Sequence, residues 1–320
     1  QLSILSNMTT TPLPEMPLLP ITSTQTVEAC RDLEVLESDV FVCSYPKSGT
    51  TWTQNLVCRL LVENVGMELP EDWHLSHTAP FYEVGQYWKE KDRVPPQTPI
   101  EGVDKESGDQ LSYRVFNTHL RPHQLPPNAR CVYVIRDELD VLASFFYHLS
   151  NMAVADGGYE GTEAQFCSDF LDGTVLYGRW QDHLEAWLGN TNKNGNIIIL
   201  HYEDMKNNLE REAQKLAQFL GVEPARVSEV VNSAIAHCTF ASMKKERVRY
   251  TPKSVDWKKD AEGKSYDNFV RTGRVGDGKE FAIKYFSDDL RQKRNRDRET
   301  SVARWRDANV DPAIIDRYLS

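Results

Sequence analysis

Short apolar runs alternate with longer segments of helical periodicity along this chain, and this alternation constrains the fold more than any other feature. The apolar runs lie at 39–46, 113–119, 130–137 and 196–204. Segments whose apolar residues recur at helical spacing, here called helical stripes, lie at 51–65, 138–152, 174–188 and 209–221. Strands that alternate with helices form a parallel sheet covered on both faces. The sequence therefore predicts an α/β fold with a central parallel β-sheet flanked by helices.

No repeat and no clear linker divides the chain, which predicts a single domain over residues 21–320. Residues 1–20 are rich in proline and lack the basic start and long apolar core of a signal peptide, so a poorly ordered N-terminal extension is expected. The region 66–112 is rich in Pro, Gly and aromatic residues and reads as irregular. Beyond Ser287 charges of both signs are dense, which indicates a solvated helix face.

Composition excludes several classes of function. The chain has 320 residues, of which 40% are hydrophobic and 26% charged, as in soluble globular proteins. Its formal net charge of −10 argues against a nucleic-acid or anionic-membrane partner. No apolar run approaches the ~20 residues that a membrane span needs. The six cysteines are scattered without a CxxC pair, which predicts no metal site and a reducing, cytoplasmic location.

The segment "YPKSGTTW" at 45–52 lies where the first apolar run meets the first helical stripe. Parallel sheets bind ligands at the carboxyl ends of their strands, and a helix N-terminus attracts anions. Lys47 supplies a charge, Gly49 allows close backbone approach, and Ser48, Thr50 and Thr51 supply hydroxyl groups. Taken alone, the segment fits a phosphate loop and an ordinary turn capped by Ser48 or Thr50 about equally.

A nucleoside triphosphatase or small-molecule kinase is disfavoured. Its motif is G-x-x-x-x-G-K-[ST], whereas the lysine here precedes the glycine. The chain also shows no obvious acidic residue at the end of a second strand that could hold magnesium.

The segment resembles the 5′-phosphosulfate loop of the cytosolic sulfotransferases, which use 3′-phosphoadenosine 5′-phosphosulfate as donor. Five further segments resemble signatures of that family and follow in its order: "NTHL" (117–120), "VYVIRDELDVLASFFYH" (132–148), "YEDM" (202–205), "HCTFASMKK" (237–245) and "FVRTGRVGDGKEF" (269–281). A chance match to six ordered motifs is very improbable. The chain is therefore identified as a divergent member of this family, with a P-loop-like strand–loop–helix unit for the 5′-phosphosulfate.

The resemblance implies roles for particular residues. His119 would be the general base, because the ordinary pKa of histidine lies near neutrality and the residue ends a strand at the carboxyl edge. Lys47 would stabilise the leaving oxygen, and Ser144 would hydrogen-bond Lys47 and restrain it. The donor, and its product 3′,5′-adenosine bisphosphate, would bind without a metal to Lys47, Ser48, Gly49, Thr50, Thr51, Trp52, Arg136, Ser144, Tyr202, Cys238, Phe240, Arg271, Thr272 and Gly273.

Four positions depart from the family pattern. Asn117 and Thr272 stand where lysine is usual, Gly278 stands where tryptophan is usual, and Cys238 stands where threonine is common. Two cations are thereby lost, and a thiol is a weaker hydrogen-bond partner than a hydroxyl. These changes bear on donor affinity more than on the class of reaction. The family's short dimerisation motif is not recognisable either, so a homodimer has no support from the sequence.

The implied function is sulfuryl transfer from this donor to a hydroxyl or amine of a small-molecule acceptor. Phe81, Leu149 and Met152 are the candidate acceptor-binding residues. The glycine-rich, acidic segment 154–165 is expected to form a lid or rim, which favours an acceptor that carries an amine. The alternative is a nucleotide-binding protein without catalysis, and retention of both His119 and Lys47 counts against it.

Overall fold

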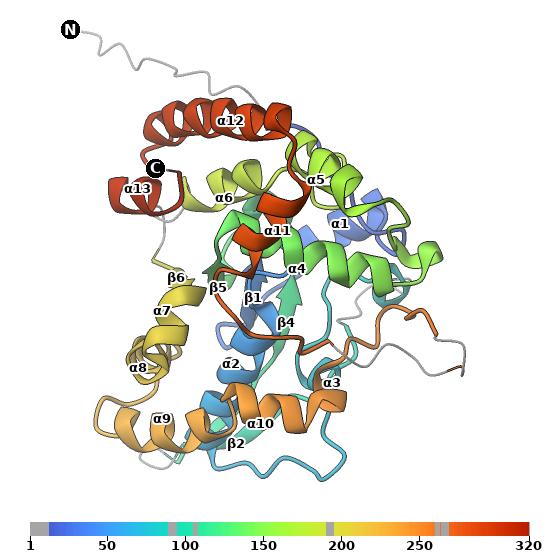
Figure 1. Cartoon of the computed structure of the whole chain (residues 1–320). Helices are drawn as coiled ribbons and strands as arrows, with labels where there is room; N and C mark the ends of the chain where they lie inside the picture. Colours follow the sequence, from blue (N-terminus) through green and yellow to red (C-terminus); the bar gives the residue numbers. More distant parts are fainter. Residues whose placement is uncertain are drawn as a thin grey trace, which may run out of the picture.

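A four-stranded parallel sheet forms the centre of the protein (Figure 1). The computed structural model describes residues 13–88, 95–104, 108–189, 195–259, 263 and 269–319. The sheet has the strand order β4–β1–β5–β6, with β1 at Val40–Ser44, β4 at Val115–Thr118, β5 at Arg130–Ile135 and β6 at Ile197–His201. The predicted α/β class with a central parallel sheet is confirmed.

The sheet is buried on both faces because alternate side chains of each strand enter different cores. Phe41 and Tyr133 belong to one cluster of buried residues, whereas Val42 and Val132 belong to the other. The first cluster also contains residues of α1 (Thr24–Arg31), α4 (Glu138–Asn151), α5 (Glu163–Asp172), α6 (Trp180–Leu188), α11 (Asp277–Tyr285), α12 (Asp288–Asp307) and α13 (Pro312–Leu319). The second contains residues of α2 (Thr50–Val65), α8 (Leu209–Phe219) and α9 (Val227–Ala236). The continuous apolar runs in the sequence reflect this double coverage.

Helices directly follow β1, β5 and β6 along the chain, as the alternating pattern predicts. The described helices are α1 Thr24–Arg31, α2 Thr50–Val65, α3 Leu75–Thr78, α4 Glu138–Asn151, α5 Glu163–Asp172, α6 Trp180–Leu188, α7 Tyr202–Asn207, α8 Leu209–Phe219, α9 Val227–Ala236, α10 Phe240–Lys245, α11 Asp277–Tyr285, α12 Asp288–Asp307 and α13 Pro312–Leu319. Short 3₁₀ turns lie at Gly85–Trp88, Pro122–Gln124, Val154–Asp156 and Arg247–Tyr250. None of the helices in the described ranges is long and apolar enough to cross a membrane.

Three expected elements need correction. The helix expected over 174–188 begins only at Trp180, because Tyr177 and Gly178 both have left-handed backbones, with φ of 67° and 69°. The strand expected over 196–204 ends at His201, and α7 starts directly at Tyr202. The region 66–112, expected to be irregular, contains α3 and an antiparallel pair of strands, β2 Ile100–Val103 and β3 Gln110–Tyr113.

The N-terminal segment packs against the domain from residue 13 onwards, whereas 1–12 lie outside the described residues. Met16 and Leu19 are buried in the first core. The carbonyl oxygen of Pro14 accepts a hydrogen bond from Arg121, and that of Pro17 accepts one from the backbone N–H of Tyr177. The expected boundary at residue 20 therefore falls inside a packed segment.

The charged segment beyond Ser287 begins with α12, a single helix of 20 residues (Figure 1). Arg294 pairs with the buried Glu138 of α4 at 2.7 Å, and Arg304 pairs with the buried Asp182 of α6 at 2.9 Å. Trp305 is completely buried against Trp180. This helix thus combines a solvated face, as expected, with a face anchored by ion pairs and one large aromatic side chain.

Gly278, one of the departures noted above, lies where α11 crosses α4. A Cβ at this position would overlap the backbone of Leu139 and Asp140. The close crossing holds the preceding turn against the first turn of α4, because the Gly276 N–H donates to the carboxylate of Asp140. A large side chain therefore cannot enter here, which gives the departure at Gly278 a structural reason.

Substituting Gly278 by alanine is expected to destabilise the protein by about 1–3 kcal/mol, because overpacking forces the two helix backbones apart. Chemical denaturation measures this loss as a lower midpoint. Lys279→Ala, at an exposed position of the same helix, is the matched control and should change stability by less than about 0.5 kcal/mol. Equal stability of the two variants would contradict the close crossing.

Candidate active site

The carboxyl ends of the four parallel strands converge on one cavity of about 250 Å³. The loop 45–49 follows β1, His119 follows β4, Arg136 follows β5 and Tyr202 follows β6. Of the residues predicted from the sequence, the cavity is lined by Lys47, Gly49, Thr50, Thr51, Trp52, Phe81, His119, Arg136, Ser144, Leu149, Tyr202, Phe240, Arg271, Thr272 and Gly273. Ser48, Cys238 and Met152 are not among its lining residues.

The loop after β1 leaves the N-terminus of α2 open. Its N-cap is Gly49, with φ of 107°, and no side chain caps the helix. The hydroxyl of Thr50 is instead bonded to Ser44 at 2.6 Å. The hydroxyl of Ser48 is buried and has no hydrogen-bond partner among the described residues. The alternative of an ordinary turn capped by Ser48 or Thr50 is therefore wrong, and the free N–H groups suit an anion.

Aromatic rings pack tightly around the two glycines of the cavity wall. A Cβ on Gly49 would lie 2.7 Å from the Tyr202 ring, and a Cβ on Gly273, whose φ is 59°, would lie 2.6 Å from the Phe240 ring. The rings of Trp52 and Tyr202 meet edge to face with centroids 5.4 Å apart. These contacts fix a group of aromatic surfaces beside the loop, which suits a flat heterocycle.

Cys238 lies behind this wall. Its carbonyl oxygen accepts a hydrogen bond of 2.7 Å from the indole of Trp52, and its buried thiol accepts one from Asn55. Burial raises the pKa of this thiol to about 12. Cys238 therefore positions Trp52 through its backbone, whereas the sequence predicted that it would contact the ligand itself.

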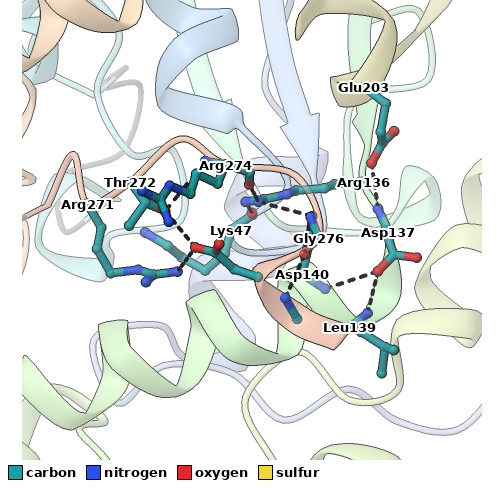
Figure 2. A network of polar contacts seen from close by, with 12 residues as sticks. Lys47, Arg136, Asp137, Leu139, Asp140, Glu203, Arg271, Thr272, Arg274 and Gly276 are labelled. Carbon is teal, nitrogen blue, oxygen red and sulfur yellow. Dashed lines mark hydrogen bonds and ion pairs between the residues drawn. The ribbon is translucent and has the colours of Figure 1, made fainter. Parts of the chain in front are cut away.

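Arg136 is almost buried, and its guanidinium is held from three sides. It donates to the carbonyl oxygen of Arg274 at 2.8 Å and pairs with Asp140 at 3.4 Å (Figure 2). Its plane lies 4.3 Å from the centroid of the Tyr202 ring. The Nε atom has no hydrogen-bond partner among the described residues. Arg136 is thus rigidly placed and retains a free donor, as an anion-binding arginine would.

Asp140 links this arginine to the segment that carries the late signature (Figure 2). Its carboxylate accepts from the backbone N–H groups of Gly276 and Gly278 at the start of α11. Asp137, three residues earlier, caps α4 by accepting from Leu139 and Asp140. Both of these helix starts are therefore satisfied by carboxylates, in contrast to the open start of α2.

Arg271 and Thr272 converge on one carboxylate, that of Asp277. Arg271 lies 3.4 Å and the Thr272 hydroxyl 2.9 Å from the same oxygen (Figure 2). The Arg271 guanidinium also lies 4.9 Å from the ring of Tyr147. Threonine in place of lysine thus removes a charge but keeps a hydrogen bond that orders the segment.

His119 presents one ring nitrogen to the cavity. Its Nδ1 lies 2.8 Å from the carbonyl oxygen of Ser44, which only accepts hydrogen bonds, so Nδ1 carries the proton and Nε2 has a free lone pair. Its backbone N–H donates to the buried Glu83, and its carbonyl oxygen accepts from His183. Burial, with a smaller contribution from Lys47, lowers the pKa of His119 to about 4.

The Lys47 side chain crosses the cavity, and its backbone has a left-handed φ of 67°. Its Nζ lies 3.3 Å from Nδ1 of His148 and 4.2 Å from the centroid of the Phe269 ring. Burial, reinforced by the charges of Arg136 and Arg271, lowers the pKa of Lys47 to about 7. An anion bound among these three cations would favour the protonated form.

Ser144 lines the cavity, but its hydroxyl forms no hydrogen bond with Lys47 among the described residues. The ammonium contacts His148, one helical turn further along α4. His148 was not predicted from the sequence, although the i, i+4 spacing from Ser144 places both side chains on one face of the helix. Phe269, Tyr177 and Lys206 also line the cavity and were not predicted, although Phe269 opens the late signature and Lys206 directly follows "YEDM".

The end of the cavity beside His119 is apolar. The ring centroids of Phe81 and Tyr177 lie 5.7 and 5.1 Å from that of His119, and Leu149 lines the same space. Met152 is buried and pairs with Trp257 in an isolated β-bridge, so it supports the wall from behind.

Positive charge dominates the cavity. Among its described lining residues four are Lys or Arg and none is Asp or Glu. The acidic segment 154–165 contributes no lining residue either, so the expected acidic rim is not part of this cavity. No group of three His, Cys, Asp or Glu residues in the described ranges could hold a metal ion.

A sulfotransferase-domain family model matches residues 37–305, most of the chain. The chain is 34% identical to rat sulfotransferase 1C2 over 251 residues, which covers 75% of this chain and 76% of that protein. It is 36% identical to rabbit amine sulfotransferase over 225 residues, which covers 68% of this chain and 67% of that protein.

Solved structures share the fold at lower sequence identity. Retinol dehydratase in complex with androsterone and the inactive cofactor PAP has a TM-score of 0.61 at 18% identity, over 89% of this chain and 84% of that one. Mouse sulfotransferase SULT7A1 in complex with PAP has a TM-score of 0.57 at 21% identity, over 85% and 87%. The family match and the two curated relatives together show that this chain belongs to the sulfotransferase family and is a transferase of that type.

Proposed function

We propose that the protein transfers a sulfuryl group from 3′-phosphoadenosine 5′-phosphosulfate to a hydroxyl or neutral amine of a small-molecule acceptor. One observation carries this proposal: a single cavity contains both the free Nε2 of His119 and the open N-terminus of α2 with Lys47. A proton acceptor beside an apolar space and an anion site beside aromatic rings are the two halves that such a transfer needs.

The residues present fit the donor. The uncapped start of α2 and Lys47 suit the 5′-phosphosulfate, and Arg136 and Arg271 suit the 3′-phosphate. Arg136 Nε and Ser48 Oγ are buried polar atoms without a described partner. A phosphate could satisfy the first, whereas the second lies outside the lining of the cavity. The aromatic wall that includes Trp52 and Phe240 suits adenine.

Each residue has a separate task in this proposal. His119 Nε2 accepts the proton of the acceptor hydroxyl while the new S–O bond forms. The bond from sulfur to the phosphate oxygen breaks, and Lys47 stabilises the charge that develops on that oxygen. Arg136 and Arg271 hold the adenosine bisphosphate in place, and Phe81, Tyr177 and Leu149 exclude water from the acceptor. A cationic acceptor would meet four positive side chains without a lining carboxylate, so neutral phenols and alcohols are favoured.

The cytoplasmic location stays a prediction that rests on six buried, unpaired cysteines.

Transfer of labelled sulfate from the donor to a panel of phenols, aliphatic alcohols and amines tests the proposal. We expect donor-dependent labelling of neutral phenols or alcohols, and little labelling of amines that are protonated at neutral pH. Calorimetric binding of 3′,5′-adenosine bisphosphate, run in parallel, identifies the alternative function. Binding without transfer to any acceptor would indicate a nucleotide-binding protein, and absence of both would contradict the proposed function.

A further inference from the structure

His148 lines the cavity, and the mechanism proposed above gives it no role in proton transfer or in binding the adenosine bisphosphate. It comes from α4, one turn after Ser144, and its Nδ1 lies 3.3 Å from Lys47 Nζ. Its ring packs edge to face against Trp257 and Phe269, with centroids 5.2 and 5.7 Å away. Two aromatic neighbours therefore fix the orientation of the imidazole that meets the lysine.

The chemistry of the contact determines which form of His148 is present. An ammonium group only donates hydrogen bonds, so Nδ1 must accept and Nε2 must carry the proton. Burial, reinforced by the charges of Lys47 and His119, lowers the pKa of His148 well below its ordinary value. The ring therefore stays neutral and retains its acceptor atom at neutral pH.

No other group around Lys47 accepts a hydrogen bond from its ammonium. Arg136 and Arg271 repel the ammonium, and Phe269 offers a ring face at 4.2 Å. His119 keeps a free lone pair on Nε2, but this atom forms no hydrogen bond with Lys47 among the described residues. Within the described part of the chain, the one hydrogen bond of Lys47 Nζ is the contact with His148.

We propose that His148 is a positioning residue that holds the Lys47 ammonium between the donor loop and the acceptor end of the cavity. This inference rests on the proposed function of Lys47. It assigns to His148 the orientation of Lys47 that the family resemblance had implied for Ser144. The Phe269 ring contacts His148 and lies 4.2 Å from the Lys47 ammonium, so it supports the same position.

Two substitutions separate the acceptor atom from the shape of the ring. His148→Phe keeps a flat ring against Trp257 and Phe269 but removes the acceptor, whereas His148→Gln keeps an acceptor without the ring. We expect kcat/KM for the donor at pH 7 to fall roughly five- to tenfold in His148→Phe and about twofold or less in His148→Gln, because hydrogen bonds to charged groups are the stronger ones.

The pH profile provides a readout that a packing defect alone would not move. Lys47 must be protonated to act, and its pKa of about 7 makes kcat/KM fall as the pH rises through that value. Removing an acceptor that favours the charged form lowers this pKa. The alkaline limb should therefore lie at lower pH in His148→Phe than in the wild type, by roughly half a unit to one unit. In His148→Gln it should lie at the wild-type pH. Equal losses in both variants without a shifted limb would overturn the proposal, as would wild-type kinetics in His148→Phe.

A measurement on the ligand-free protein keeps this test independent of catalysis. Nitrogen chemical shifts of ¹⁵N-labelled histidine should show His148 protonated at Nε2 and His119 protonated at Nδ1. Lys47→Met should change the Nδ1 shift of His148 and leave the tautomer of His119 unchanged. An unaltered His148 signal would overturn the proposal. If the wild type shows these tautomers but neither binds the nucleotide nor transfers sulfate, the proposed function fails while the Lys47–His148 contact stands.

Discussion

Replacing His119 by alanine is expected to lower kcat for sulfuryl transfer by about 10²–10⁴-fold, the usual contribution of a positioned general base. Its free Nε2 faces the apolar end of the cavity, and its backbone is held by Glu83 and His183. Binding of 3′,5′-adenosine bisphosphate should change by less than about threefold, because the proposed donor contacts lie on other residues. His123→Ala, an exposed histidine near the following turn, is the matched control.

The pH dependence of wild-type kcat/KM provides a second test of His119 as the general base. The neutral imidazole is the active form, and its pKa is lowered to about 4 by burial. Activity should therefore persist below pH 6.5 and be lost only as the pH falls through about 4. An acid limb near 6.5, or turnover in His119→Ala within tenfold of the wild type, would contradict the assignment of His119 as the base.

Replacing Lys47 by methionine is expected to lower kcat by about 10²–10³-fold, as for the loss of one group that stabilises the developing charge. Methionine retains much of the length and the apolar stem but has no charge. Donor affinity should also fall, since Lys47 belongs to the loop before the uncapped start of α2 and lines the same cavity. Steady-state kinetics with the donor as varied substrate separates the two effects, and Lys279→Met, at an exposed position, is the control.

The Lys47 variant should also lose the alkaline limb of the pH profile. In the wild type, kcat/KM should fall as the pH rises through about 7, because the unprotonated amine cannot stabilise the leaving oxygen. Together with the acid limb of His119, this gives a bell-shaped profile between about pH 4 and 7. An unchanged alkaline limb in Lys47→Met would assign that ionisation to another group.

Local sequence patterns were sufficient for the centre of the fold and for the residues that the ends of β1 and β5 bring to the cavity. β1, the loop 45–49 and α2 fall where the apolar run, the glycine and the helical stripe predict them. The same holds for β5 and the arginine at its end, because strand ends in a parallel sheet converge on one edge. These features depend on short stretches of chain and on a general rule of topology.

Features that depend on contacts between distant segments were not predictable in this way. The late start of α6 depends on the left-handed backbone conformation of Tyr177 and Gly178, which no local motif indicated. The position of Cys238 behind Trp52 depends on a hydrogen bond between residues 186 positions apart. The contact between Lys47 and His148 joins residues 101 positions apart and has the same origin.

A crystal structure of the protein with 3′,5′-adenosine bisphosphate and a sulfated or unsulfated acceptor tests the central claim most directly. We predict the 5′-phosphate at the start of α2 beside Lys47 and the 3′-phosphate on Arg136 and Arg271. The acceptor oxygen should lie within hydrogen-bond distance of His119 Nε2. A nucleotide bound in the opposite orientation, or an acceptor oxygen out of reach of His119, would contradict the account.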